Sequence, residues 1–160
     1  MGRTGLFTLI FSLAAFSAVA DIPECLMKKG QVLPINNAQV LEWKNQTANQ
    51  FHSRGHIKGI LTQTYSEKTN HHHWQVQIGD TEKDTIEVIY NEDFGSVDRF
   101  TIGSQIEACG DYITSNKKGN GFPASPDGAL VHWVHMSPNP NHLPGYLVVD
   151  GQLHGQEYNE

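Results

Sequence analysis

The sequence is poor in features that mark several common protein classes. Its 160 residues include only two cysteines, too few for a disulfide-rich scaffold. Eleven Lys and Arg residues stand against 17 Asp and Glu residues, which gives a formal net charge of −6. This acidic balance argues against a protein that grips the phosphates of duplex DNA, because such proteins usually show a basic patch or stripe. We therefore do not expect duplex nucleic acid as a partner.

Several catalytic and metal-binding motifs are also absent from the sequence. It contains no HExxH or CxxC ligand pair, and no GxSxG elbow to present a nucleophilic serine. Gly119 and Gly121 lie in a long loop without a following helix, so they do not predict a phosphate-binding loop. No motif of this kind assigns an enzymatic activity.

The one long hydrophobic run lies at the N-terminus. Arg3 precedes apolar residues 6–15, and residues 18–20 form the small-x-small pattern that a signal peptidase recognises. The apolar run is shorter than the roughly 20 residues that a transmembrane helix needs. We predict that residues 1–20 are a cleaved signal peptide, that no segment spans a membrane, and that the protein is exported to the periplasm or beyond.

Export changes what is expected of Cys25 and Cys109. In an oxidising compartment, two thiols in a small domain favour a single disulfide, here between the N-terminal segment and the later half of the chain. In the chain-entropy model, closing so long a loop contributes roughly 4 kcal/mol of stability. The alternative is a pair of buried free thiols.

The hydrophobic pattern changes near residue 54. Residues 21–53 predict an irregular lead-in and one helix over 37–51, with Asn36 and Asn37 as candidate capping residues. From Arg54 onward, short apolar alternations between polar turns indicate strands. These strands are expected around residues 57–61, 74–78, 85–90, 106–113 and 129–134, with a hairpin around Asp150-Gly151 after residues 146–149.

Short strands with one helix favour a mostly β fold. We predict a small, mostly antiparallel, OB-like five-stranded barrel over residues 54–160, with an N-terminal α-helix before it and a C-terminal hairpin within its extension. A β-sandwich is the alternative, although that fold usually needs about seven strands.

Histidine is unusually frequent, with nine residues. Residues 71–73 are three consecutive histidines, His132 and His135 flank Trp133, and a further histidine follows at position 142. Neutral imidazole is a common ligand of zinc, copper, iron and nickel. The candidate ligands of a transition metal such as zinc are therefore two or more of His71, His73, His132, His135 and His142.

Strand geometry limits how these histidines could act together. On a regular strand His132 and His135 point to opposite faces, so they could share an ion only if the strand broke between them. His71 and His73 share one face, whereas His72 points away from it. The alternative is that most of these imidazoles cap turns, bond to the backbone or lie exposed to solvent.

Several short motif elements follow one another along the chain in a characteristic order. They are Gly55 with Ile57, His71 with Trp74, Tyr90 to Asp93, Gly103 with Gly110 and Tyr112, the HWVHMSP run over 132–138, His142, and Gly145-Tyr146. In order and spacing they resemble a family of small exported bacterial proteins of uncharacterised function, which carry an HWTHHDP-type motif. This sequence departs from the family pattern at three positions. It has Tyr90 where the family has a histidine, Ser137 where the family has an aspartate, and Tyr146 where the family has a tryptophan.

The resemblance implies an OB-like barrel and an exported bacterial protein, and it carries no established activity. It also points to four histidines, because these occupy motif positions: His71, His132, His135 and His142.

The first functional hypothesis is an exported binding module. Its barrel face and the loops over 66–70, 115–128 and 137–145 would recognise an extracytoplasmic ligand or partner. The candidate contact residues are Trp74, Asn91, Asp93, Phe122, Trp133 and Tyr146. Packing in the core is the alternative role for the two tryptophans on predicted strands.

The second hypothesis is a histidine-centred metal site. Three of the candidate histidines would leave one open position on zinc, and Asn91 or Asp93 would orient an imidazole. Such a site would capture a metal or support hydrolysis of the nuclease or phosphodiesterase kind, an analogy that rests on the fold alone.

Overall fold

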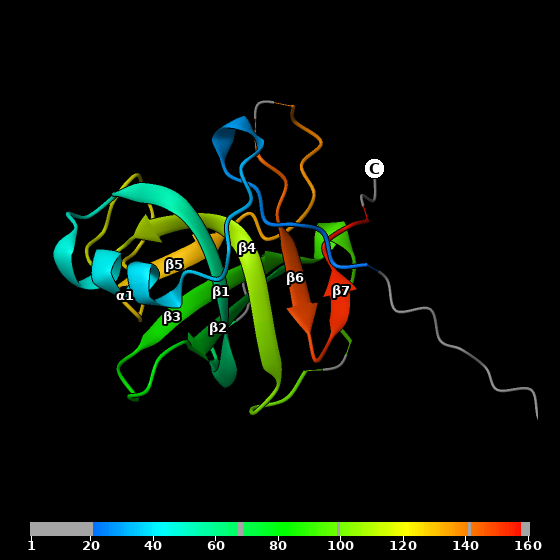
Figure 1. Cartoon of the computed structure of the whole chain (residues 1–160). Coiled ribbons are helices and arrows are strands. Elements are labelled where there is room, and N and C mark those ends of the chain that lie inside the picture. Colours follow the sequence, from blue (N-terminus) through cyan, green and yellow to red (C-terminus); the bar gives the residue numbers. More distant parts are fainter. Residues whose placement is uncertain (1–20, 67–68, 99, 141, 158–160) are drawn as a thin grey trace, which may run out of the picture.

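The computed structural model describes residues 21–66, 69–98, 100–140 and 142–157 (Figure 1). The predicted signal peptide lies outside this range. Along the chain the elements are η1 (Lys28–Gly30), α1 (Asn37–Gln46), β1 (His52–Thr64), β2 (His71–Gln77), β3 (Thr85–Asn91), η2 (Glu92–Phe94), β4 (Gln105–Thr114), β5 (Ala129–His132), β6 (Tyr146–Val149) and β7 (Gln152–His154). Within the described residues, none of the helices combines the length and apolar character that a membrane crossing requires.

Five strands close into a barrel. Their order is β1-β2-β3-β5-β4, and β4 pairs back onto β1; β6 and β7 extend the sheet from β4. β1 serves two partners because its first half pairs with β4 and its second half with β2, with an irregularity in the register between Leu61 and Gln63. All pairings are antiparallel except β3 with β5. The predicted mostly β barrel with one helix and a C-terminal hairpin is confirmed at this level.

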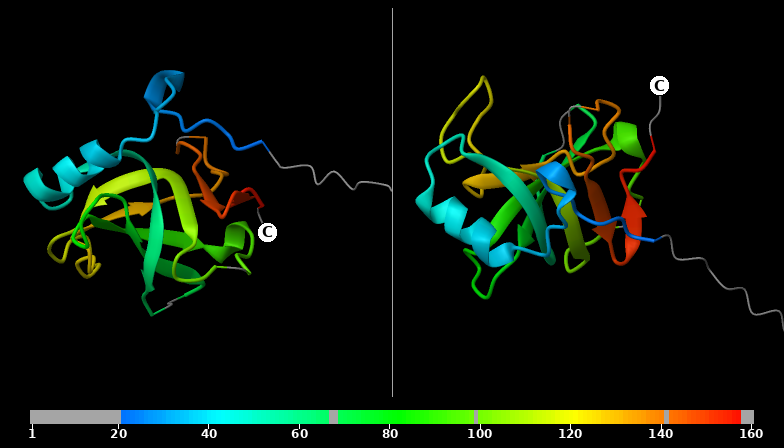
Figure 2. Two further views of the ribbon diagram at one scale, coloured as in Figure 1. Left: turned by 60° about the horizontal axis from the view of Figure 1, so that its bottom comes forward. Right: turned by 45° about the horizontal axis from the view of Figure 1, so that its top comes forward.

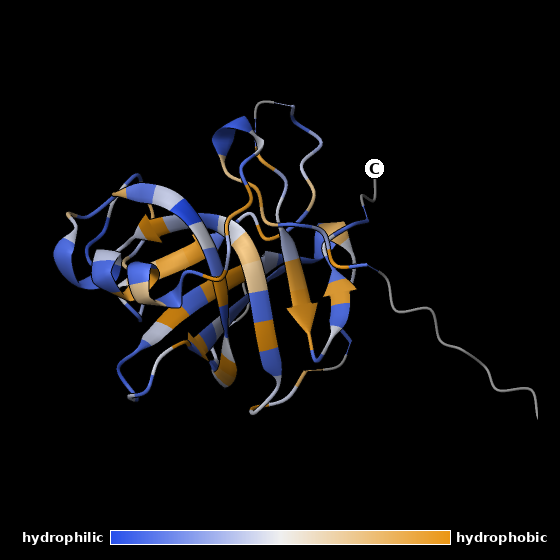
Figure 3. Cartoon of the chain, viewed as in Figure 1, coloured by the Kyte–Doolittle hydropathy of each residue, from blue (hydrophilic) through white to orange (hydrophobic). Residues whose placement is uncertain are grey.

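Alternation along the strands separates the core from the outer face. On β2, His72, Trp74 and Val76 are buried inside the barrel, whereas His71 and His73 are only partly buried. Figure 3 shows the same banding on β4 and a nearly continuous apolar β6. The alternate positions on the outer face are therefore polar on β2, and on β3 they are polar except for Ile89.

The helix is shorter than predicted. It ends at Gln46, where Thr47 adopts an extended conformation and bonds back to the carbonyl of Trp43 through both its amide and its hydroxyl. Asn36 is the N-cap residue, but its side chain makes no capping bond; its Oδ1 accepts from the amide of His56 on β1 at 2.8 Å. The side-chain capping prediction was wrong because this amide ties the helix to the barrel instead.

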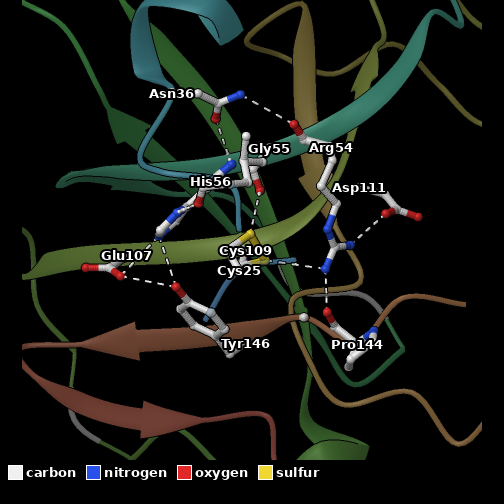
Figure 4. Close-up of a disulfide and its surroundings, with 12 residues drawn as sticks. Cys25, Asn36, Arg54, Gly55, His56, Glu107, Cys109, Asp111, Pro144 and Tyr146 are labelled. Atoms are coloured by element: carbon white, nitrogen blue, oxygen red, sulfur yellow. Dashed lines mark hydrogen bonds and ion pairs between the residues drawn. A yellow bond between two sulfur atoms is a disulfide. The ribbon is translucent and has the colours of Figure 1, made fainter. Parts of the chain in front are cut away.

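The predicted disulfide is present. Cys25 and Cys109 are bonded across 84 residues of sequence, so the alternative of free thiols was wrong. Both cysteines are buried and cluster with Tyr146 and Val148. Figure 4 shows the disulfide with Tyr146 beside it. The bond fastens the N-terminal segment across β4.

The C-terminal hairpin also forms as predicted. Asp150 and Gly151 join β6 to β7 and both have positive φ, 49° and 84°, as a type I′ turn requires. The Asp150 carboxylate accepts hydrogen bonds from the hydroxyl of Ser104 and the amide of Gln105, both at 2.8 Å.

Two long loops leave opposite ends of β5. Residues 115–128 lead into its start, and residues 133–145 follow its end. Figure 2 shows them, in yellow and orange, rising from the barrel at separate places. The second of these, called here the β5–β6 loop, carries most of the features described next.

Candidate functional site

The backbone is unusual at the end of β5. The strand stops at His132, two residues earlier than predicted, and Trp133 has a left-handed φ of 57°. This conformation costs an L-residue roughly 1–2 kcal/mol, and it is rare for a bulky side chain. The strand thus breaks between His132 and His135, and both residues line one pocket.

Three glycines pack so closely against this turn that a side chain at any of them would meet its backbone. A Cβ atom at Gly110 would collide with the carbonyl oxygen of His132, and one at Gly145 with that of Trp133. One at Gly155 would lie 2.8 Å from the carbonyl oxygen of residue 134. Gly145 also donates its amide to the carbonyl of His135 at 2.7 Å. No other residue fits these three positions without moving the turn.

A buried arginine holds the β5–β6 loop against the barrel. Arg54, 7% exposed, donates to Asp111 Oδ1 at 2.8 Å and to the carbonyl oxygen of Pro144. It also lies 3.3 Å from the sulfur of Cys109 (Figure 4). The guanidinium therefore connects β1, β4, the disulfide and the end of the loop.

The loop is held at a second point by His142. Its Nε2 lies 3.5 Å from Asp111 Oδ2, and its ring stacks on the Trp133 indole with ring centres 4.3 Å apart. The indole is thus supported from the barrel through His142. His142 is not among the residues that line the pocket.

A pocket of about 380 Å³ lies where β2 begins and where β3 and β5 end. It brings together six residues that the sequence singled out, from elements far apart in the chain. Its lining is His71, Asn91, Asp93, Phe94, His132, Trp133, His135 and Pro138.

Backbone carbonyls fix the tautomers of two histidines in this pocket. The Nδ1 atom of His71 lies 2.7 Å from the carbonyl oxygen of Thr69, and that of His135 lies 2.6 Å from the carbonyl oxygen of Met136. A carbonyl only accepts, so each ring carries its proton on Nδ1 when it is neutral. Each Nε2 is then left with a lone pair.

His132 is kept uncharged by its surroundings. Burial is the largest influence, and repulsion from the other imidazoles adds to it, so the pKa of His132 falls from 6.5 to about 4. The contributing neighbours are His71, His135, His73 and His142. Burial also lowers the pKa of His135.

Hydrogen bonds also hold Asn91 and Asp93 in place on the other side of the pocket. Asn91 ends β3 and accepts the amide of Asp93 through its side chain at 3.0 Å. The Asp93 carboxylate accepts from the Asn70 amide group at 2.7 Å, and Asn70 adopts a left-handed φ of 61°. Phe94 stacks on the His135 ring at 3.6 Å.

Three predicted contact residues lie elsewhere. Trp74 is buried in the barrel core, which was the alternative role for this residue. Phe122 is 73% exposed on the loop that leads into β5. Tyr146 is buried beside the disulfide, where its hydroxyl lies 3.0 Å from His56 Nε2 and donates to Glu107 at 3.3 Å; its pKa is raised, mainly by burial.

The four candidate metal ligands at motif positions are only partly brought together. The ring centres of His71 and His132 are 6.0 Å apart, and His142 faces Asp111. Across the part of the chain that the structure describes, no three His, Cys, Asp or Glu side chains are placed to hold a metal ion.

Sequence reasoning missed Phe94 and Pro138 in the pocket and a nearby carboxylate–imidazole pair. Glu87 on β3, 4% exposed, lies 2.7 Å from Nδ1 of His73 on β2. Strand alternation placed each of these two residues on a face, but only the register of β2 against β3 makes them neighbours.

No protein-family model and no curated protein matches this chain. The resemblance to the exported bacterial family therefore stays a prediction. The functional argument rests on the pocket and on the backbone that shapes it.

The strain at Trp133 predicts that glycine is a more stable replacement than alanine at this position, the reverse of the usual order of stability. Trp133→Gly and Trp133→Ala both remove the indole, but only alanine keeps a Cβ atom at positive φ. We expect the glycine variant to be more stable by about 1 kcal/mol in urea unfolding. At Leu130, within β5, the same pair should show the usual order with alanine more stable. An alanine variant at 133 as stable as the glycine variant would contradict the strain.

His132 predicts a loss of stability in acid. Its pKa is lower in the folded state, so the unfolded state binds more protons below about pH 6.5. Stability is complete above that pH and is lost as the pH falls toward 4, by about 2 kcal/mol between pH 8 and pH 5.

Urea unfolding across this range should show a flatter profile for His132→Asn. His52→Asn removes an exposed histidine at the start of β1 and should leave the wild-type profile unchanged. Equal profiles for wild type and His132→Asn would show that His132 is not buried as described.

Proposed function

We propose that this protein is an exported, OB-like binding module whose ligand occupies the pocket between the ends of β2, β3 and β5. The buried disulfide supports export, because such bonds persist mainly outside the reducing cytosol. The N-terminal pattern of charge, apolar run and small residues supports it as well.

The strand connections support the OB-like assignment. The closed order β1-β2-β3-β5-β4 with a parallel contact between β3 and β5 fits a five-stranded Greek-key barrel. Proteins of that fold bind ligands on the outer face of their second and third strands and with the adjoining loops. His71 and Asn91 face each other in the register of those two strands, next to the β1–β2 loop.

The single observation that carries this proposal is the left-handed Trp133. Bulky residues in this conformation persist only where the surroundings enforce them, and they cluster at ligand clamps and active sites. Glycine is the usual residue where a chain merely needs a tight turn. Here a tryptophan occupies the strained position and lines the pocket, which is expected if the indole contacts a ligand.

The composition of the lining is that of a small-molecule site. Aromatic rings form much of the wall, and a few polar groups are fixed by hydrogen bonds to the backbone or to neighbouring side chains. The volume lies within the range of about 300–1,000 Å³ common for ligand pockets. These features favour recognition of a compact molecule.

A metal site is the second candidate, and one observation favours it. Histidines that bind metals usually donate their other ring nitrogen to a carbonyl or carboxylate, as the Nδ1 atoms of His71 and His135 do here. Binding would require these rings and His132 to move closer together, since they do not form a ligand group as they stand. About one equivalent of zinc in the untagged protein, lost in the His132→Ala/His135→Ala double variant, would favour this function.

The binding proposal is tested by a ligand screen followed by NMR. Neutral, anionic and cationic small molecules are added to ¹⁵N-labelled protein recovered from an oxidising periplasm. We expect the shifted amides to concentrate around residues 71, 91–94 and 132–136. Trp133→Ala should abolish these shifts, and Phe122→Ala, which removes an exposed aromatic ring from the other long loop, should preserve them. Shifts that vanish only in the Phe122 variant would contradict the proposal.

A further inference from the structure

Three polar side chains of the pocket present hydrogen-bond acceptors to it. His71 and His135 each commit the Nδ1 proton to a backbone carbonyl, so each retains a lone pair on Nε2. Asp93 contributes a carboxylate, which accepts from Asn70 through one oxygen. A ligand that matches these groups must bring donors of its own.

The charged side chain that lines the pocket is a carboxylate, so the pocket favours positive charge. Among the described residues that line it there is no Lys or Arg, whereas Asp93 contributes a carboxylate. Arg54 on β1, which holds the β5–β6 loop, is already paired with Asp111. The formal charge of −6 on the whole chain acts in the same direction. An anionic ligand would be repelled, and a cation would be attracted.

Three kinds of ligand could supply donors or positive charge to these groups. Neutral hydroxyl groups donate, but they leave the charge of Asp93 unmatched. A metal ion needs a tighter ligand group than the described residues provide. A protonated primary amine has three donors and one positive charge, and the face of an indole such as Trp133 attracts it further.

We propose that the ligand of this pocket carries a protonated primary amine, which donates to Nε2 of His71 and His135 and pairs with the Asp93 carboxylate. The inference rests on the proposed binding function and specifies the chemistry of its ligand. The remainder of the ligand lies against the aromatic wall formed by Trp133 and Phe94.

Four compounds of graded chemistry test the assignment on the wild-type protein at pH 8. They are butylammonium chloride, 1-butanol, sodium butyrate and zinc chloride, and binding is followed by amide shifts in ¹H–¹⁵N spectra. We expect butylammonium to shift the pocket amides, 1-butanol to bind at least tenfold more weakly, and butyrate not to bind. Butanol or butyrate binding as tightly as the amine would overturn the assignment.

A matched pair of variants tests the role of Asp93. Asp93→Asn and Asp80→Asn change the net charge equally, but Asp80 is exposed in the turn between β2 and β3, at the opposite end of these strands. We expect the first variant to weaken butylammonium binding at least tenfold and the second to leave it unchanged. Spectral dispersion confirms that each variant is folded. Equal effects of the two substitutions would overturn the ion pair.

The outcomes also separate this inference from the function on which it rests. Pocket shifts with neutral or anionic compounds, but not with butylammonium, would overturn the amine and leave the binding function standing. Zinc binding without amine binding would overturn the amine in favour of a metal site. If no compound of the screen or of this series shifted the pocket amides, both proposals would fail.

Discussion

The structure depends on the close approach of backbone atoms around the left-handed turn at Trp133. The carbonyl oxygens of residues 132–134 lie against three glycines, where no Cβ atom fits. Because the turn cannot relax into a regular strand without disturbing these contacts, β5 ends at His132. The two histidines that flank the indole then line the same pocket instead of opposite faces of a strand.

The rest of the fold holds this turn in place from several directions. The barrel brings the ends of β2, β3 and β5 together, which places His71 and Asp93 beside the turn. Arg54 reaches from β1 to the end of the β5–β6 loop and touches the disulfide on the way. His142 supports the indole from behind the loop through Asp111. Strain at one residue is thus sustained by contacts from distant parts of the chain, as expected for a strained functional position.

Local patterns in the sequence were sufficient to locate the strands, although not all of their ends. Period-two alternation placed Trp74 and Val76 in the core, and Asp150-Gly151 marked its hairpin because both positions of that turn require positive φ. The disulfide followed from expected export and from the count of two cysteines. The same alternation separated His72 from His71 and His73 correctly.

The pocket could be predicted only in part, because its shape depends on long-range backbone contacts. Motif positions pointed to His71, His132 and His135, but strand geometry gave no reason for the last two to meet. The glycines that force the break are distant in sequence, so periodicity does not report them. Tyr146 and Phe122 share their residue type with contact aromatics, and only tertiary structure places one beside the disulfide and the other in solvent.

The central claim is that this backbone presents imidazole lone pairs to a ligand, and the ring tautomers test it most directly. Long-range ¹H–¹⁵N correlation spectra of the imidazoles at pH 8 report which nitrogen of each ring is protonated. The account predicts protonated Nδ1 and unprotonated Nε2 for both His71 and His135. Protonated Nε2 in both rings would show that the carbonyl contacts do not form, and it would contradict the account.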